Sequence, residues 1–201
     1  MYKGQKYDPG DVILSVGAFS KNTLECWQAH SPVLLVDYEA GPDTFKGKKP
    51  LESKNGKTIG TLELHPEAVT DKNGVMTLYK FKGGPLGDSV CSKWQQDIKK
   101  SEYFNGEVKV QTVSMASVLR RFPAVRECYM NCEGSEIPIL LNTPLDLLAR
   151  CRYICVEFHR FSSFLDISNG DVLQCVERLR NTFDVRCIED YHPAYEFTRK
   201  P

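Results

Sequence analysis

Hydrophobic residues gather in short runs separated by polar segments, and these runs predict alternating strands and helices. Two continuous apolar runs, at 12–16 and 33–37, are typical of strands that are covered on both faces of a sheet. Further strands are predicted at 59–64, 75–81, 108–113, 126–132, 152–158, 183–188 and 195–198. Helices are predicted at 22–30, 114–122, 135–148 (interrupted at Thr143-Pro144) and 168–181. This order predicts one α/β domain over residues 1–201, with a mostly parallel sheet and an antiparallel C-terminal strand.

Composition places the chain among globular proteins without an obvious polyanionic partner. It has 201 residues, 41% of them hydrophobic and 26% charged, with a formal net charge of zero. A neutral balance gives no reason to expect nucleic acid or an anionic membrane as a partner. Residues 1–6 contain no apolar stretch, and no run approaches membrane-spanning length. We therefore expect a cytoplasmic protein.

Eight cysteines raise the question of a zinc site. The pairs Cys128/Cys132 and Cys151/Cys155 each enclose three residues, which resembles the spacing of metal ligands. Both pairs fall in predicted strands, where residues four apart are separated by roughly 13 Å. Two such sulfurs cannot bind one ion, so we predict buried thiols in a reducing compartment and no metal.

The ends of the first two predicted strands carry candidate ligand-binding residues. Gly17-Ala18 forms a small-residue turn after the first strand, which lets a nucleotide approach the backbone. Glu39 follows the second strand, where a carboxylate commonly accepts hydrogen bonds from ribose hydroxyls; a solvated loop acid is the alternative. The chain lacks both G-x-G-x-x-G and G-x-x-x-x-G-K-[ST], which argues against dinucleotide and P-loop sites.

A second candidate lies at Glu133-Gly134-Ser135-Glu136, where a predicted strand gives way to a helix. The carboxyl ends of strands are where open α/β sheets bind ligands. Ser135 as N-cap and Glu136 in the first turn would also simply begin a helix. That interpretation leaves Glu133 unexplained, because a carboxylate that closes an apolar strand is costly to desolvate without a partner.

Read in order, these segments resemble the FkbM-type S-adenosylmethionine-dependent methyltransferases. The matching positions are Ser15-Val16-Gly17-Ala18, Tyr38-Glu39-Ala40-Gly41-Pro42, Ala68-Val69 with Asp71 and Gly74, the segment 129–136, and Glu157 with His159. The resemblance covers roughly residues 11 to 160. It implies a Rossmann-like class I methyltransferase fold and S-adenosyl-L-methionine as the cofactor.

The resemblance also implies roles for individual residues. Cofactor-binding residues would be Ser15, Gly17, Ala18, Glu39, Ala68, Val69 and Asn131. Catalytic residues would be His159, Glu133 and Glu157, with His159 as the candidate base; a packed or capping histidine is the alternative. Glu136 and Ser89 would contact the substrate. The expected reaction is methyl transfer to a hydroxyl oxygen of a small molecule or carbohydrate.

Departures from the family pattern support an alternative function. The family's acid in the first strand is Ser15 here, its acid before Glu-Gly is Asn131, and its second loop glycine is Lys21. A catalytically inactive protein of the same fold, serving as a binding or assembly module, therefore stays open beside the enzyme. Two other segments are predicted as loops: the lysine-rich 45–58, solvated or meeting an anionic substrate, and the Gly/Pro-rich 81–94.

Overall fold

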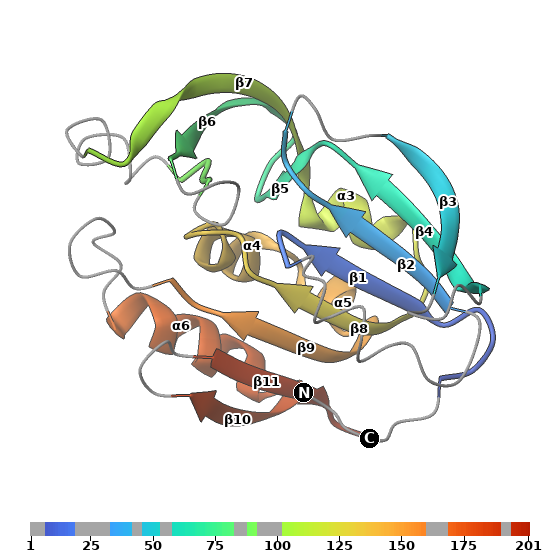
Figure 1. The fold of residues 1–201 in the computed structure, drawn as a ribbon. Coiled ribbons are helices and arrows are strands. Elements are labelled where there is room, and N and C mark those ends of the chain that lie inside the picture. Colours follow the sequence, from blue (N-terminus) through green and yellow to red (C-terminus); the bar gives the residue numbers. More distant parts are fainter. Residues whose placement is uncertain are drawn as a thin grey trace.

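The computed structural model describes residues 7–18, 33–41, 46–52, 58–82, 88–91, 102–159, 169–189 and 194–201. These residues form a large sheet, a small sheet and four helices (Figure 1). The strands of the large sheet follow the order β10 (Phe183–Glu189), β11 (Ala194–Arg199), β9 (Cys151–Glu157), β8 (Val125–Met130), β1 (Val12–Val16), β2 (Val33–Tyr38), β4 (Thr58–His65) and β3 (Gly47–Glu52). The small sheet has the order β5 (Ala68–Thr70), β7 (Phe104–Ser114) and β6 (Gly74–Phe81). The helices are α3 (Met115–Arg120), α4 (Glu136–Asn142), α5 (Leu145–Leu148) and α6 (Asn169–Arg180).

Strand directions make the large sheet mixed but mostly parallel. β4, β2, β1, β8 and β9 pair parallel to one another, whereas β3 and β11 pair antiparallel to their neighbours. β10 is antiparallel to β11 and so runs with the parallel set. Numbered along the chain, the five parallel strands lie in the order 3-2-1-4-5, and the order reverses between β1 and β8. That reversal is a topological switch point, the place where such sheets bind ligands.

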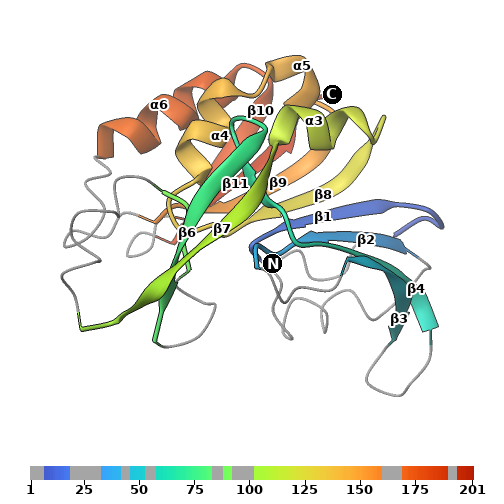
Figure 2. The same ribbon diagram turned by 90° about the horizontal axis from the view of Figure 1, so that it is seen from above.

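Alternate side chains of the central strands enter two different cores. Leu14, Val16 and Val36 belong to the larger core, while Ile13 and Leu35 belong to a smaller core on the opposite face. Helices α3, α4, α5 and α6 lie together on one side of the large sheet (Figure 2). Their buried residues join the larger core, so this face carries most of the apolar burial among the described residues.

The small sheet stands beside the carboxyl ends of the large sheet's parallel strands (Figure 1). It has its own core of Ala68, Leu78, Val90 and Val110. Its long strand β7 leads directly into α3, whose first turn is capped by Ser114: the Ser114 hydroxyl accepts a hydrogen bond from the Ser117 N–H at 3.1 Å. β7 thereby connects the small sheet directly to a helix whose buried residues belong to the larger core.

Most predicted elements are confirmed. α4 ends at Asn142 and α5 begins at Leu145, on either side of the Thr143-Pro144 interruption, because proline cannot continue a helix. The prediction that 45–58 is a loop is wrong in part, because Gly47–Glu52 forms the edge strand β3. The small sheet was also not foreseen, since β5 was not predicted as a strand and β6 and β7 were expected in one sheet with the others. The predicted helix at 22–30 lies outside the described residues.

Within the described ranges, no helix is long and apolar enough to cross a membrane.

Candidate functional site

A pocket of about 250 Å³ lies across the carboxyl ends of β1, β2 and β8, at the switch point. The tips of these strands form one side, and the small sheet with residues 88 and 90 forms the other. Its lining comprises Val16, Gly17, Tyr38, Glu39, Ala40, Ala68, Val69, Leu78, Asp88, Val90, Asn131, Cys132, Glu133 and Ser135. The lining therefore combines apolar and acidic side chains around a small space.

Gly17 allows the tips of β1 and β8 to meet beneath the pocket. Its φ is +60°, and an added Cβ would lie 2.5 Å from the backbone oxygen of Asn131. The Gly17 N–H donates to the Tyr38 oxygen at 2.9 Å, and the Asn131 N–H donates to the Val16 oxygen at 3.0 Å. Only glycine satisfies both the left-handed backbone and this close approach.

Three carboxyl groups line the pocket, namely Glu39, Asp88 and Glu133. Burial raises the pKa of Glu39 to about 7, and the charges of Asp37 and Asp88 add to that shift. Burial likewise raises the pKa of Glu133 to about 7, although the charge of His159 opposes it. Burial also raises the pKa of Asp88, whose Oδ1 accepts the Phe81 N–H at 2.8 Å. Three partly buried acids around one pocket favour a cationic ligand.

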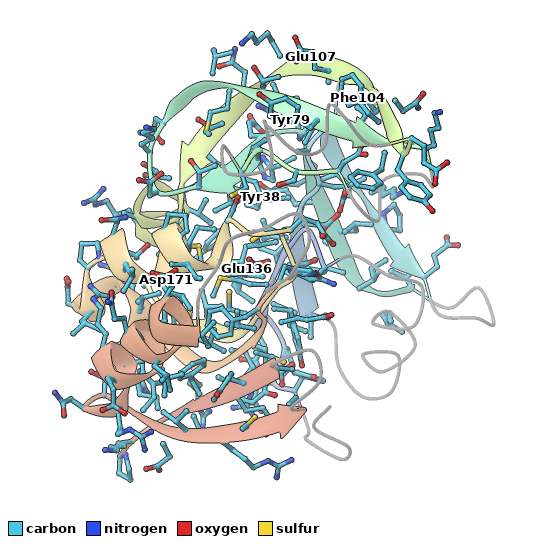
Figure 3. All side chains as sticks on the ribbon, turned by 90° about the vertical axis from the view of Figure 1, so that its left-hand side faces the viewer. Tyr38, Tyr79, Phe104, Glu107, Glu136 and Asp171 are labelled. Atoms are coloured by element: carbon cyan, nitrogen blue, oxygen red, sulfur yellow. The ribbon has the colours of Figure 1, made fainter. Side chains whose placement is uncertain are left out.

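The turn between β8 and α4 is held in a strained conformation by Glu136. Glu133 has φ 51° and Gly134 has φ 97°, so two successive residues are left-handed. The fully buried Glu136 carboxylate accepts the N–H of Cys132 at 2.7 Å and that of Gly134 at 2.9 Å. Figure 3 shows Glu136 in the interior of the molecule, whereas Glu107 lies on the outer side of the small sheet. Ser135 is the N-cap residue of α4 and Glu136 lies in its first turn, as the sequence suggested, but the Ser135 side chain makes no capping hydrogen bond.

His159 is buried between two carboxylates. Its Nδ1 lies 3.0 Å from Glu136 Oε1 and its Nε2 lies 3.3 Å from Glu133 Oε1. Burial alone would lower the pKa of His159, but the hydrogen bond and charge of Glu136, with the charges of Glu133 and Glu157, raise it to about 9. At neutral pH the ring is therefore an imidazolium that donates from both nitrogens and has no lone pair free to accept a proton.

Ser89 supports the same turn from the other side. Its hydroxyl donates to the backbone oxygen of Glu133 at 2.6 Å and accepts the Cys91 N–H at 3.0 Å. The side chain is buried and does not line the pocket, whereas its neighbours Asp88 and Val90 do. Ser89 thus holds the strained turn in place and positions Asp88.

The structure brings about half of the sequence-predicted residues into one pocket. Lining residues are Gly17, Glu39, Ala68, Val69, Asn131 and Glu133. The other predicted residues, which do not line it, are Ser15, Ala18, Ser89, Glu136, Glu157 and His159. Glu136 and His159 contact Glu133 or its turn, and the charge of Glu157 acts on both Glu133 and His159. Sequence reasoning missed Leu78, which lies in the predicted strand 75–81, and also Asp88 and Val90, for which the Gly/Pro-rich segment 81–94 was the only signal.

The cysteines of the described part of the chain are free thiols. No group of three or more His, Cys, Asp or Glu side chains in that part is arranged to hold a metal ion.

A scan against protein-family models and searches of curated proteins and of solved structures found no match to this chain.

Proposed function

We propose that the protein is an S-adenosyl-L-methionine-dependent O-methyltransferase with a class I methyltransferase fold. The observation that carries the proposal is the acidic pocket at the switch point between β1 and β8, lined by Gly17, Glu39 and Glu133. A parallel order of 3-2-1-4-5, followed by an antiparallel strand near the C-terminal edge, agrees with the fold that the sequence resemblance implies.

The pocket residues fit a nucleoside carrying a positive charge. Glu39 follows β2, where a carboxylate accepts hydrogen bonds from ribose hydroxyls. Ala68, Val69 and Leu78 offer an apolar wall for a flat base. The carboxylates of Glu39 and Glu133 favour a sulfonium over a neutral ligand. The volume of about 250 Å³ is slightly below the usual range of small-molecule sites, about 300–1,000 Å³, so the ligand must be small.

When bound, the cofactor would supply an electrophilic methyl group. The chain's residues would then hold an acceptor hydroxyl in line with that methyl group, and Glu133 would accept the hydroxyl proton as the oxygen–carbon bond forms and the sulfur–carbon bond breaks. With a pKa of about 7, Glu133 is close to the optimum for a base at neutral pH. His159, as an imidazolium 3.3 Å from Glu133, would orient that base rather than act as the base itself. The acceptor would be a small molecule or a carbohydrate.

A non-catalytic binding module is the second candidate. It is favoured by the neutral Ser15 and Asn131 at positions where the family carries acids, and by His159 being held as a cation. Such a module would use the same pocket to bind a nucleoside without transferring a methyl group.

Titration calorimetry with S-adenosylhomocysteine tests the proposed cofactor site. We expect saturable binding by the wild-type protein and a loss of about 1–3 kcal/mol of binding free energy in Glu39→Ala, because its hydrogen bonds to ribose would be removed. The matched control is Glu102→Ala, an exposed acid outside the pocket, which should bind as the wild type does. If the wild-type protein gives no heat of binding at millimolar S-adenosylhomocysteine, the proposed cofactor is rejected. Binding without methyl transfer to any hydroxylated acceptor would favour the module.

A further inference from the structure

A second cavity, of about 430 Å³, lies at the end of the large sheet opposite the switch point. It is formed where β8 and β9 begin and β11 ends (Figure 1). Its lining comprises Arg126, Arg152, Tyr153, Thr198, Arg199, Lys200 and Pro201. Four of these side chains are basic, and none of the described residues that line the cavity is acidic. Because the chain as a whole has no net charge, this is a local excess of positive charge.

Strand register brings three of the basic residues together. Glu127, Tyr153 and Thr198 are register partners across β8, β9 and β11. Arg126, Arg152 and Arg199 are the next residue on each strand, toward the same end of the sheet, so they form a row of arginines on three adjacent strands. Neighbouring strands are about 4.8 Å apart, and like charges opposite one another destabilise a sheet. The fold therefore keeps a row that is unfavourable by itself.

The cavity opens across the end of the sheet rather than on one face. Each arginine of the row lies two positions from a residue of the larger core, namely Cys128, Ile154 and Phe197, and so lies on the helix side. Tyr153 and Thr198, one position from the arginines, belong to the other side. Since residues of both sides line the cavity, a ligand there would lie at the strand ends, within reach of long arginine side chains.

Most of the positive charge around the cavity is not neutralised by the protein. Arg126 Nε lies 3.8 Å from Asp11 Oδ2, which offsets one charge. Arg199 donates to the Ala149 oxygen at 2.9 Å and Lys200 donates to the Arg180 oxygen at 2.8 Å, but backbone oxygens carry no net charge. Arg152 is exposed and pairs with no acid in the described part of the chain. About three positive charges therefore remain for a ligand.

The remaining polar group of known orientation is already engaged. The Tyr153 hydroxyl donates to Glu196 Oε1 at 2.8 Å. Glu196 does not line the cavity, and its Oε2 pairs with Arg186 Nε at 3.2 Å. The phenol proton is thus directed away from any ligand, and the charge of Glu196 is offset by a cation of its own. Recognition in the cavity would depend on the guanidinium groups.

A phosphate group matches this arrangement better than a carboxylate does. A phosphomonoester carries about −1.5 to −2 charge at neutral pH and three strong acceptor oxygens. Guanidinium groups bind phosphate through two parallel hydrogen bonds each, with a geometry that a lysine cannot provide. The cavity volume of about 430 Å³ falls within the usual range of small-molecule sites, about 300–1,000 Å³, and leaves room for an organic group beside the phosphate.

We propose that this cavity binds the phosphate group of a small anionic molecule, with Arg126, Arg152 and Arg199 as its binding residues. The bound phosphate would neutralise the row of arginines and remove their mutual repulsion. The cavity shares no lining residue with the pocket at the switch point, so it is independent of the proposed cofactor.

An NMR titration at constant ionic strength tests the site with three probes: inorganic phosphate, ribose 5-phosphate and ribose. We expect saturable shifts of the backbone amides of Arg126, Arg152 and Arg199 with both phosphates and none with ribose. Arg152→Gln should weaken phosphate binding by about 10-fold or more, the effect of losing a hydrogen bond between charged groups. The control is Lys109→Gln, which removes an exposed positive charge from β7 in the small sheet and should change affinity by less than about twofold.

A separate measurement shows that the variant is intact. Arg152→Gln should unfold in urea at the wild-type midpoint or above it, because it removes one of three neighbouring like charges. It should also bind S-adenosylhomocysteine as the wild type does, so a failure of the phosphate site leaves the proposed cofactor untouched. Tighter binding of ribose 5-phosphate than of inorganic phosphate would assign the cavity to a phosphorylated small molecule, and equal binding would assign it to free phosphate. Absence of saturable shifts, equal binding of ribose, or equal losses in Arg152→Gln and Lys109→Gln would overturn the proposal.

Discussion

At Gly17, the absence of a side chain determines whether the tips of β1 and β8 can approach. We predict that Gly17→Ala lowers the free energy of unfolding by about 2–4 kcal/mol, because it adds left-handed backbone strain to a 2.5 Å clash with the Asn131 oxygen. Urea unfolding measures this loss. Gly10→Ala is the matched control, since Gly10 has φ +88° with nothing within 4 Å of an added Cβ, so strain alone should cost about 1 kcal/mol. Equal losses in the two variants would contradict the role of the close approach.

Glu133 is the residue on which the chemistry of the proposed reaction depends. We predict that Glu133→Gln slows methyl transfer about 100-fold or more, because an amide cannot accept the hydroxyl proton. Affinity for S-adenosylhomocysteine should change by less than about fivefold, as the side chain keeps its shape. Single-turnover kinetics separates the two effects, with Glu102→Gln as the exposed control. A rate that is unchanged in Glu133→Gln would remove the residue from the mechanism.

The sequence pattern predicted some of the site residues and not others. Glu39 and Glu133 were found because each stands just past an apolar run, where a strand end predicts a ligand. Asp37 does not line the pocket, but its charge acts on Glu39; the pattern did not single it out, because one acid does not change the pattern of a strand. Asp88 lies in a Gly/Pro-rich segment whose path the local pattern does not determine. The pairing of His159 with Glu136, 23 residues apart, follows only from the way β8, α4 and β9 pack.

At the scale of elements, the turn from β8 into α4 depends on one buried carboxylate. We predict that Glu136→Gln lowers the free energy of unfolding by about 2–3 kcal/mol, because the Cys132 and Gly134 N–H groups and His159 lose a charged partner. Chemical denaturation measures the loss. Glu177→Gln on α6 removes an exposed ion pair with Arg180 and should stay within about 0.5 kcal/mol of the wild type. A similar loss in both variants would show that Glu136 does not hold the turn.

The elements themselves were predictable where the pattern is local. β1 and β2 are continuous apolar runs, and Pro144 separates α4 from α5 as expected. β3 was not predicted because it is an edge strand that contains two lysines and a proline. Such residues keep exposed sheet edges from pairing further, and they do not give the apolar pattern of a strand. The small sheet was not predicted for another reason. Alternation identifies β6 and β7 as strands, but which strand pairs with which is a non-local property that periodicity does not contain.

At the scale of the whole molecule, the pocket's titratable groups set how stability depends on pH. The pKa values of Asp37, Glu39 and Glu133 are raised to about 6, 7 and 7 in the folded protein. The folded state therefore holds protons that the unfolded chain has already released, and stability falls as pH rises from about 4.5 to 7. His159 acts in the same direction at higher pH, because its pKa is raised from 6.5 to about 9. Its contribution is fully present below pH 6.5 and is lost as pH rises through about 9.

The ion-pair cluster around Glu63 acts in the opposite direction at low pH. Burial alone would raise the pKa of Glu63, but hydrogen bonds from His65, Lys48 and Arg121 lower it to about 2. Its stabilising contribution is present above about pH 4.5 and is lost as pH falls towards 2. The two trends together predict that stability is highest on the acid side of neutrality.

We therefore predict that the free energy of unfolding declines from about pH 5 to pH 9, by up to about 1.4 kcal/mol per pH unit for each proton involved. Urea unfolding at a series of pH values measures the decline. Glu133→Gln should flatten it between pH 5 and 7, because the amide does not titrate, whereas Glu102→Gln should follow the wild-type curve. A cationic ligand should flatten it as well, since pairing with a cation lowers the pKa of each pocket acid and removes the excess protons of the folded state. A wild-type maximum at pH 7 or above would contradict the raised pKa values of these acids, and with them the physical reason for expecting a cation in the pocket.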